Sequence, residues 1–188
     1  MQKSLLIVVS APSGCGKGTI LGQILKDEKY YYSVSATTRA PRQGEVDGVH
    51  YRFMPKERFE QLISENAFLE YAPYCEHYYG TLKQPITDAL ANGKHVILEI
   101  EVQGAMQIRE LLPDAKFIFI APPDLETLRQ RLIARGTESE EVIAERIAQA
   151  EKELQYKDQY DYCIVNQILD DAIADFRSVI RAEEFKIN

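Results

Sequence analysis

The stretch that decides the fold of this chain is Ser10-Ala11-Pro12-Ser13-Gly14-Cys15-Gly16-Lys17-Gly18-Thr19. It follows the apolar run 5–9 and precedes a helical pattern. Gly14 and Gly16 let successive backbone N–H groups converge on phosphate oxygens, and a helix N-terminus adds its positive dipole end. Lys17 adds a point charge for the β- and γ-phosphates of a nucleotide. The stretch therefore predicts a phosphate-binding loop between a strand and a helix.

The loop departs twice from the pattern G-x-x-x-x-G-K-[ST], with Ala11 at the first Gly and Gly18 at the final hydroxyl residue. Gly18 removes the hydroxyl that usually holds Mg²⁺, so we expect the ion to be bound mainly through nucleotide phosphates and water, with Thr19 as a substitute ligand. The alternative is a glycine-rich turn with an incidental lysine. The preceding strand and the following helix favour the phosphate loop. Cys15 lies among amides that would stabilise a thiolate; we expect a small residue at a permissive position, and its sensitivity to oxidation stays open.

The rest of the chain alternates between strand and helix patterns. Further strands are predicted over residues 96–100, 117–120 and 163–165. Helices are predicted over residues 18–25, 103–112, 125–135 with Asp124 as N-cap, and 140 to about 156 with the capping box Thr137-x-x-Glu140. The strands are apolar on successive residues, as expected of a parallel sheet that is covered on both faces. The pattern predicts a three-layer α/β core around a central parallel sheet.

Residues 33–81 break this alternation with Pro41, Gly44, Gly48 and Pro55 among clustered tyrosines and short alternating pieces. We interpret them as a small mixed or antiparallel subdomain inserted into the core. The corner at 135–137, between two polar helices, indicates a second mobile piece. The predicted organisation is one domain, with a core of residues 1–32, 82–130 and 151–188, an insertion of about 33–81 and a lid of about 131–150. Two such flaps suit an enzyme that closes over two ligands and excludes water.

Composition excludes several classes of protein. The chain has 188 residues, of which 45% are hydrophobic and 27% charged, as in an ordinary globular domain. Its net charge of −7, from 22 basic and 29 acidic residues, argues against nucleic-acid and membrane partners. Three cysteines and three histidines form neither a disulfide framework nor a zinc spacing. No apolar run is long enough for a signal sequence or a membrane span, which predicts a cytoplasmic protein.

Residues 33–51 read Ser-Val-Ser-Ala-Thr-Thr-Arg-Ala-Pro-Arg-Gln-Gly-Glu-Val-Asp-Gly-Val-His-Tyr. This long and irregular segment closely resembles the guanylate kinases, which phosphorylate GMP with ATP. Further matches follow in order at residues 68–70, 78–81, 98–104, 118–123, 135–138 and 164–166. The resemblance covers essentially the whole chain. It implies a phosphate-loop kinase core with an inserted GMP-binding subdomain and a helical lid.

The resemblance implies that Arg39, Arg42, Tyr51 and Tyr79 grip the phosphate of GMP. The chemistry agrees, because two guanidinium groups three residues apart can address a dianion bidentately while phenols donate from the sides. Two arginines alone would favour a solvated basic loop. Two arginines beside tyrosines in an acidic protein favour a binding site.

The resemblance also implies that Glu70 reads the guanine edge, helped by Ser35 and Thr81. Guanine presents the donors N1–H and N2–H₂ and the acceptor O6, which suit a carboxylate and hydroxyls. AMP would face the carboxylate with a lone pair at N1. Glu99 and Glu101 end the second core strand, where a doubly wound sheet binds its ligands. Family members often carry Asp at both places, and we expect Glu99 near Lys17 or Mg²⁺ and Glu101 near the GMP base or ribose.

Arg131 and Arg135 lie four residues apart and so share a helix face, and Arg146 projects from the next helix. The resemblance implies that these arginines close on the ATP phosphates; for Arg146, pairing with a nearby Glu weighs nearly as much. The predicted catalytic residues are Lys17, Arg39, Arg131, Arg135 and Arg146. The predicted ATP-binding residues are Ala11, Pro12, Ser13, Gly14, Cys15, Gly16, Lys17, Gly18, Thr19 and Asn166, the last on the adenine side.

The sequence thus predicts a kinase for GMP and dGMP that uses ATP and Mg²⁺, acts in purine nucleotide metabolism and GMP recycling, and binds small nucleotides. Self-association stays open. One alternative is a catalytically silent scaffold domain that binds peptides, but the uninterrupted phosphate loop argues against it. Another is a related kinase with a phosphorylated ribose as acceptor, but the residues expected to read guanine argue against it.

Overall fold

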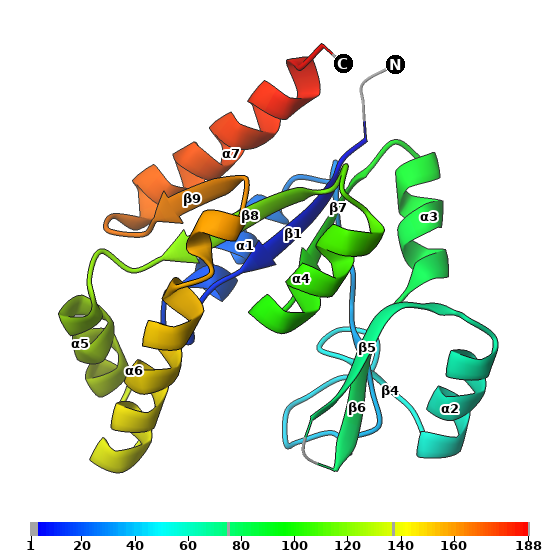
Figure 1. Cartoon of the computed structure of the whole chain (residues 1–188), viewed down its shortest axis with the longest axis horizontal. Helices are drawn as coiled ribbons and strands as arrows, with labels where there is room; N and C mark the ends of the chain where they lie inside the picture. The colour runs from blue at the N-terminus through cyan, green and yellow to red at the C-terminus, as the bar shows by residue number, and fades with distance from the viewer. Residues whose placement is uncertain (1–3, 75, 137, 188) are drawn as a thin grey trace.

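The computed structural model describes residues 4–74, 76–136 and 138–187. A five-stranded parallel sheet forms its centre, with strand order β2-β7-β1-β8-β9. The bounds are Leu6–Ser10 for β1, Tyr30–Tyr32 for β2, His95–Glu99 for β7, Lys116–Ala121 for β8 and Tyr162–Val165 for β9. Figure 1 shows β7, β1, β8 and β9 side by side. Their carboxyl ends all lie at the same edge of the sheet, because the strands are parallel.

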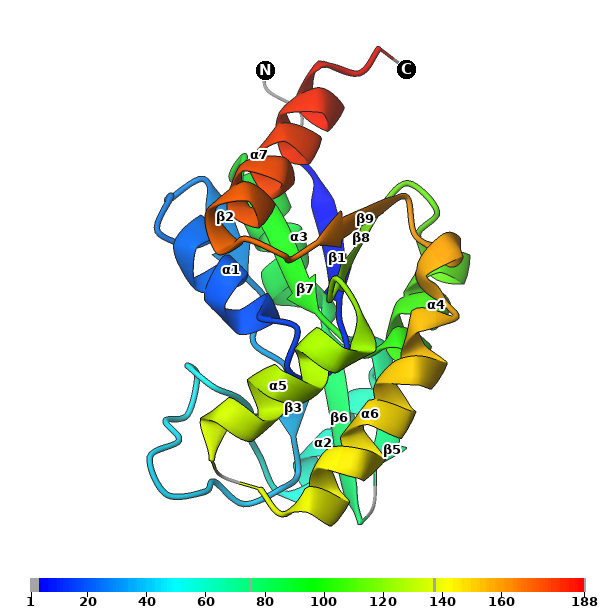
Figure 2. The same ribbon diagram turned by 90° about the vertical axis from the view of Figure 1, so that its left-hand side faces the viewer.

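Successive residues of the strands face opposite layers, so both faces of the sheet are apolar. Ile7 and Val9 of β1 are completely buried in one hydrophobic cluster, and Val8 is completely buried in the other. In the first cluster, four helices pack against the sheet: α1 (Lys17–Ile24), α5 (Leu125–Arg135), α6 (Glu140–Leu154) and α7 (Leu169–Phe185). In the second cluster, α3 (Lys83–Ala91) and α4 (Val102–Leu111) pack against the opposite face. Figure 2 shows α1 and α7 on one side of the sheet and α4 on the other, so the core has three layers.

A second, four-stranded sheet lies beyond the carboxyl edge of the first, with strand order β4-β3-β6-β5. Its bounds are Ala36–Thr37 for β3, Arg52–Phe53 for β4, Phe68–Tyr74 for β5 and His77–Leu82 for β6. The pair β3–β4 is parallel and the pairs β3–β6 and β5–β6 are antiparallel, so the sheet is mixed. The helix α2, Lys56–Ser64, packs on it through Phe59, whose ring stacks on Phe68 at 4.3 Å.

The predicted strands and helices are confirmed, with ends that differ by one or two residues. The sequence analysis missed β2, α2, α3 and α7. The strand β2 is three tyrosines long, too short for a hydrophobic period to stand out. The expected cap Thr137 lies outside the described residues, and α6 begins instead behind Ser139, whose hydroxyl accepts from the Val142 amide.

No helix within the described ranges is both long and apolar enough to cross a membrane.

Candidate functional site

The phosphate loop between β1 and α1 takes its shape from two glycines with positive φ. Gly14 has φ 91° and Gly16 has φ 84°, a region that favours glycine. A Cβ at Gly14 would meet Leu128 and Leu132 of α5 at 2.9 Å. Gly16 is the N-cap of α1, and its carbonyl accepts from the Ile20 amide at 3.0 Å. The loop is therefore the cradle of amides at a helix N-terminus that the sequence predicts.

Asn166, which follows β9, fixes this loop by a hydrogen bond to its backbone. Its side chain is buried and donates from Nδ2 to the Cys15 carbonyl at 2.7 Å. A Cβ at Gly16 would collide with the same amide nitrogen. Asn166 thus fixes the loop backbone, whereas the contact with adenine that the sequence analysis assigned to it stays a prediction.

Cys15 is completely buried in the core cluster, and its burial raises the pKa of the thiol to about 12. The stabilised thiolate that the loop amides suggested is therefore wrong in this structure. Loss of hydration outweighs the attraction of Arg131 and Lys17 for the charged form. Cys15 is a packing residue in a tight position.

Lys17 meets Glu99 at the carboxyl end of β7. The distance from Lys17 Nζ to Glu99 Oε1 is 3.4 Å, and both side chains are partly exposed. Tyr32 of β2 donates from its hydroxyl to the other oxygen, Glu99 Oε2, at 3.0 Å. Burial and the Glu99 carboxylate raise the pKa of the Tyr32 phenol. The expected position of Glu99 beside Lys17 is confirmed, and Tyr32, which the sequence analysis did not assign to the site, joins them.

The arginines of α5 and α6 approach the phosphate loop in different ways. Arg131 donates to the Asn166 carbonyl at 2.9 Å. Arg135 is exposed and lines the cavity over the loop. Arg146 donates to the Ser13 hydroxyl at 3.0 Å and pairs with Glu138 at 2.6 Å. Both interpretations of Arg146 are therefore realised, because it has a carboxylate partner and also reaches the loop.

The arginines and tyrosines expected to grip a phosphate lie together on β6 and on the loop between β3 and β4. Arg39 forms a two-pronged ion pair with Glu45, with distances of 2.8 and 2.9 Å. Its guanidinium lies 5.5 Å from the Tyr51 ring centroid, and the Tyr51 and Tyr79 rings meet edge to face at 5.9 Å. Arg42 is exposed on the same loop.

Glu45 is a member of this group that sequence reasoning missed. Besides Arg39, it accepts from the Arg42 amide at 2.6 Å. These bonds lower the pKa of the Glu45 carboxyl to about 2, and the hydrogen bond to Glu45 raises the pKa of the Arg39 guanidinium. The Arg39 side chain is thus already oriented by a carboxylate, a pairing that no linear spacing indicated.

Glu70 lies on β5 with its carboxylate turned into the space between the two sheets. Thr81 on the paired strand donates to Glu70 Oε1 at 2.6 Å. Burial raises the pKa of the Glu70 carboxyl, and the bond from Thr81 offsets part of that rise. Gly104 lies on the far side, where a Cβ would approach Glu70 Oε2 to 3.6 Å. The structure therefore brings together Glu70 and Thr81, and Glu70 lines a cavity together with Gly104.

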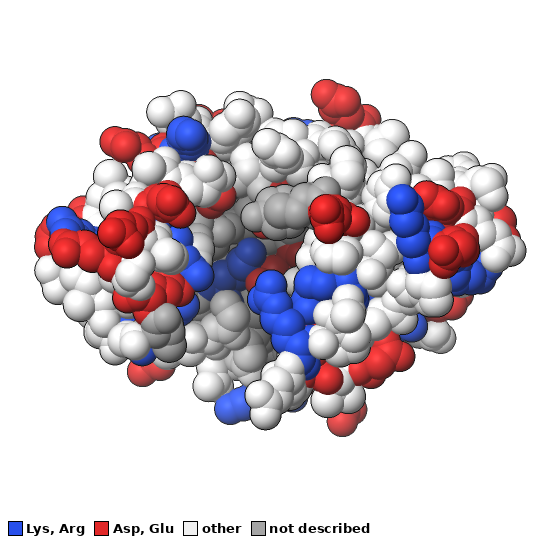
Figure 3. Space-filling model, turned by 90° about the horizontal axis from the view of Figure 1, so that it is seen from below, with Lys and Arg blue, Asp and Glu red and all other residues white. Residues whose placement is uncertain are grey.

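Two cavities adjoin at the carboxyl edge of the central sheet. The donor cavity, of about 490 Å³, is lined by the whole loop from Ala11 to Thr19 together with Arg135 and Glu153. The acceptor cavity, of about 330 Å³, is lined by Ser35, Arg39, Arg42, Glu45, Tyr51, Glu70 and Tyr79 among others. Glu99 and Glu101 line both cavities. Figure 3 shows Lys and Arg side chains gathered around a hollow in the face seen from below.

A third space, of about 460 Å³, continues behind the loop. Arg131, Arg135, Asn166, Gln167 and Leu169 line it, and it shares Gly14, Gly16 and Thr19 with the loop. Residues of α5 and of the segment that follows β9 form its wall beside the loop.

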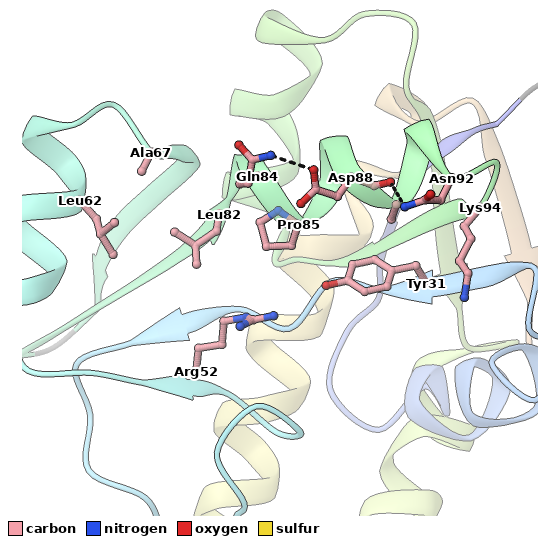
Figure 4. A pocket seen from close by; sticks show the side chains of 11 residues that line it. Tyr31, Arg52, Leu62, Ala67, Leu82, Gln84, Pro85, Asp88, Asn92 and Lys94 are labelled. Atoms are coloured by element: carbon pink, nitrogen blue, oxygen red, sulfur yellow. Dashed lines mark hydrogen bonds between the residues drawn. The ribbon is translucent and has the colours of Figure 1, made fainter.

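A larger cavity, of about 660 Å³, lies elsewhere, between α3 and the second sheet. Figure 4 shows Tyr31 and Lys94 on one side and Arg52 and Leu62 on the other. Its walls are mainly apolar and contain none of the predicted site residues. Size therefore does not identify the site here; the convergence of charged groups on the phosphate loop does.

The donor chemistry around Lys17 suits a hard cation. Glu99, Glu101 and the exposed Thr19 hydroxyl offer oxygen atoms, which Mg²⁺ prefers, and they lie on the cavity that would hold phosphates. No group of three or more His, Cys, Asp or Glu side chains that could hold a metal occurs among the residues described. The arrangement fits an ion that takes most of its ligands from nucleotide phosphates and water.

Comparison with known proteins gives one consistent family. The family model described as guanylate kinase matches residues 3–183. Curated guanylate kinases from Clostridium tetani and Streptococcus thermophilus are 48% and 50% identical over 188 residues, covering 100% and 99% of this chain and 90% of each relative. The crystal structure of guanylate kinase from Anaplasma phagocytophilum matches with a TM-score of 0.79 and 30% identity, over 99% of this chain and 89% of that one.

Proposed function

Since the chain belongs to the guanylate kinase family, we propose that it transfers the γ-phosphoryl group of ATP to GMP and so produces ADP and GDP. One observation carries the proposal: the cavity of the phosphate loop and the cavity of the second sheet adjoin, and Glu99 and Glu101 line both. Phosphoryl transfer needs donor and acceptor oxygens aligned at such a junction, and it needs little covalent chemistry from the protein.

On the donor side, the loop amides and Lys17 bind the ATP phosphates. Arg135 and Arg146 approach the loop from α5 and α6 and stabilise the charge that spreads over the transferred group. Arg131 braces the loop from behind through the Asn166 carbonyl. The α5–α6 segment, which we propose as the lid, closes over the nucleotide and excludes water.

On the acceptor side, Arg39, Arg42, Tyr51 and Tyr79 hold the phosphate of GMP. The distance between the tyrosine rings and the position of Arg39 over Tyr51 support a single anion site. Glu70 accepts from guanine N1–H and N2–H₂ through the oxygen that Thr81 leaves free. Ser35 lies in the same cavity and donates to O6, while Glu101 faces the ribose.

Mg²⁺ bound with ATP would supply positive charge that offsets the negative charge of the phosphates. Glu99 and Thr19 are the residues that would face it, directly or through water. We propose a cytoplasmic role in purine nucleotide metabolism and GMP recycling, with dGMP as a second acceptor. The scaffold alternative has no observation in its favour.

The test is turnover with ATP and Mg²⁺, with GMP, dGMP, AMP and ribose 5-phosphate offered in parallel. GMP should be phosphorylated far faster than AMP, since a mismatch of buried polar groups discriminates by roughly 10⁴-fold in favourable cases. Absence of turnover with any acceptor would support the scaffold reading. Preference for the ribose phosphate would replace GMP as the substrate.

A further inference from the structure

The hydroxyl of Tyr32, which lies outside both cavities, donates to Glu99, the carboxylate shared by both. Within the described residues, Glu99 has two partners: Lys17 at 3.4 Å on Oε1 and Tyr32 at 3.0 Å on Oε2. Tyr32 itself lines neither cavity. Its contact with the reacting region therefore passes through Glu99.

The sheet explains why these two side chains meet. In the parallel pair β2–β7, Tyr32 stands opposite Ile97, which points into the cluster beneath α1. Glu99 follows Ile97 by two residues and so lies on the same face. Tyr32 packs against this cluster with its ring, and its hydroxyl extends along the face to the carboxylate. Tyr31 points to the opposite face, into the cluster beneath α3 and α4.

Because the Glu99 side chain is long, a second hydrogen-bond partner affects how its carboxylate is oriented. A glutamate has one more rotatable bond than an aspartate, and ordering it costs more entropy. If Lys17 were its sole partner, the Glu99 carboxylate would be able to move closer to the Lys17 ammonium group and pull that group away from the phosphates. A hydrogen bond on Oε2 fixes the direction of the carboxylate, because it binds the oxygen that Lys17 does not use.

We propose that Tyr32 is a positioning residue, which holds Glu99 across the junction of the donor and acceptor cavities so that Lys17 stays directed at the transferred phosphoryl group. This inference rests on the proposed function. Tyr32 acts through Glu99 alone, so its effect falls on the rate of transfer and not on the binding of either nucleotide.

The test is a double-mutant cycle on kcat and KM. Tyr32→Phe retains the packed ring and removes the hydroxyl; we expect kcat to fall roughly tenfold, the size of one hydrogen bond to a charged group, with KM for GMP and ATP within about twofold. In the Glu99→Ala background, the same change should alter kcat by less than about twofold, because the two residues act as one unit. Tyr31→Phe is the matched control on the same strand and should leave both constants unchanged.

Two outcomes overturn the inference: an unchanged kcat in Tyr32→Phe, or the same fall with and without the Glu99 carboxylate. The latter would indicate a structural role, as would a fall in kcat that tracks a lower melting temperature. Failure of the proposed function is distinguishable, since the unaltered protein would then not phosphorylate GMP at all.

Discussion

The two loops that we propose hold phosphate are built in opposite ways: the donor loop, residues 10–19, and the acceptor loop, residues 38–51. The donor loop is packed: Cys15 is completely buried and Gly14 lies against two leucines of α5. The acceptor loop is open, with nearly every residue from 40 to 50 exposed and Glu45 as the main internal anchor of Arg39. Backbone amides form the first site, whereas side chains from separate strands form the second.

This difference has a functional reason. Every nucleoside triphosphate presents the same phosphate chain, so a rigid cradle of amides can recognise it. In the proposed reaction the acceptor must be identified by its base as well, which requires side chains with a specific hydrogen-bonding pattern, and we propose Glu70 for this role. We expect substitutions in the donor loop to reduce the rate for any acceptor, and substitutions on the second sheet to alter affinity and selectivity.

The largest effect is expected at Lys17. Lys17→Met keeps the length of the side chain and removes its charge, and kcat should fall about 10³-fold because the charge of the transferred group loses a direct partner. GMP affinity, measured by calorimetry without ATP, should stay within about twofold. Lys26→Met, just beyond α1, makes the same charge change away from the site. A kcat within tenfold of the unaltered protein would remove Lys17 from its role.

The next effect is expected at Glu70. Glu70→Gln keeps the acceptor for Thr81 but turns an amide donor toward the donors of guanine, and selectivity for GMP over AMP should fall by about 2–4 kcal/mol. The ratio of kcat/KM for the two substrates measures it. Glu65→Gln, exposed after α2, is the control with the same charge change. An unchanged ratio would count against Glu70 as the base-reading group.

The pKa of Glu70 predicts that KM for GMP depends on pH. Because burial raises this pKa, Glu70 takes up a proton at a higher pH than an exposed glutamate does, and KM for GMP should rise as the pH falls through that range. The raised pKa also means that protonated Glu70 favours the folded state. This contribution to stability is lost as the pH rises through the folded-state pKa, and ionised Glu70 then destabilises the fold. Glu70→Gln should therefore melt at a higher temperature at pH 7, while it abolishes the acid rise in KM.

The contrast also explains what sequence could predict. The donor loop is contiguous, so Gly14, Gly16 and Lys17 were identified from spacing and confirmed in place. The strands β1, β7, β8 and β9 were found because buried parallel strands read as apolar runs. On the acceptor side, the family resemblance assigned Arg39, Tyr51 and Tyr79, and the chemistry of arginines beside tyrosines supported a site; the three residues line one cavity.

What sequence could not predict are the partners that tertiary contacts create. The Glu45 carboxylate, the Tyr32 hydroxyl and the Asn166 amide have ordinary surroundings in the sequence, and each acquires its role from a residue on another element or across a loop. Only the less favoured interpretation of Cys15, a stabilised thiolate, fails, and for a related reason. The sequence places it among amides, whereas the fold covers it with side chains and so raises its pKa.

A smaller effect is expected at Glu45. Glu45→Gln removes one of the charges that hold Arg39, and KM for GMP should rise roughly tenfold with kcat little changed, because the ion pair orients Arg39 before GMP binds. With a pKa of about 2, the Glu45 carboxylate is ionised at neutral pH and keeps its ion pair with Arg39. The stability that this pair contributes is lost only as the pH falls from about 4.5 toward 2. KM in the unaltered protein should thus show no titration of Glu45 between pH 5 and 9.

Glu60→Gln on α2 is the matched control, since its lysine contact is exposed and 3.8 Å long. A lower KM for GMP in Glu45→Gln would reverse the interpretation. It would mean that the carboxylate competes with the phosphate of GMP for Arg39, and that the open loop carries an internal competitor instead of a brace.

The smallest effect is expected from thiol modification, which probes the packing of the donor loop directly. At pH 8, a thiol with a pKa of about 12 is ionised in only about one molecule in ten thousand, and Cys15 is also covered completely. Iodoacetamide should therefore label the exposed Cys163 and leave Cys15 free, with kcat unchanged. Peptide mapping by mass spectrometry separates the sites. Labelling of Cys15 at the rate of Cys163, with loss of activity, would mean that the loop opens often, and the contrast between a packed donor loop and an open acceptor loop would then fail.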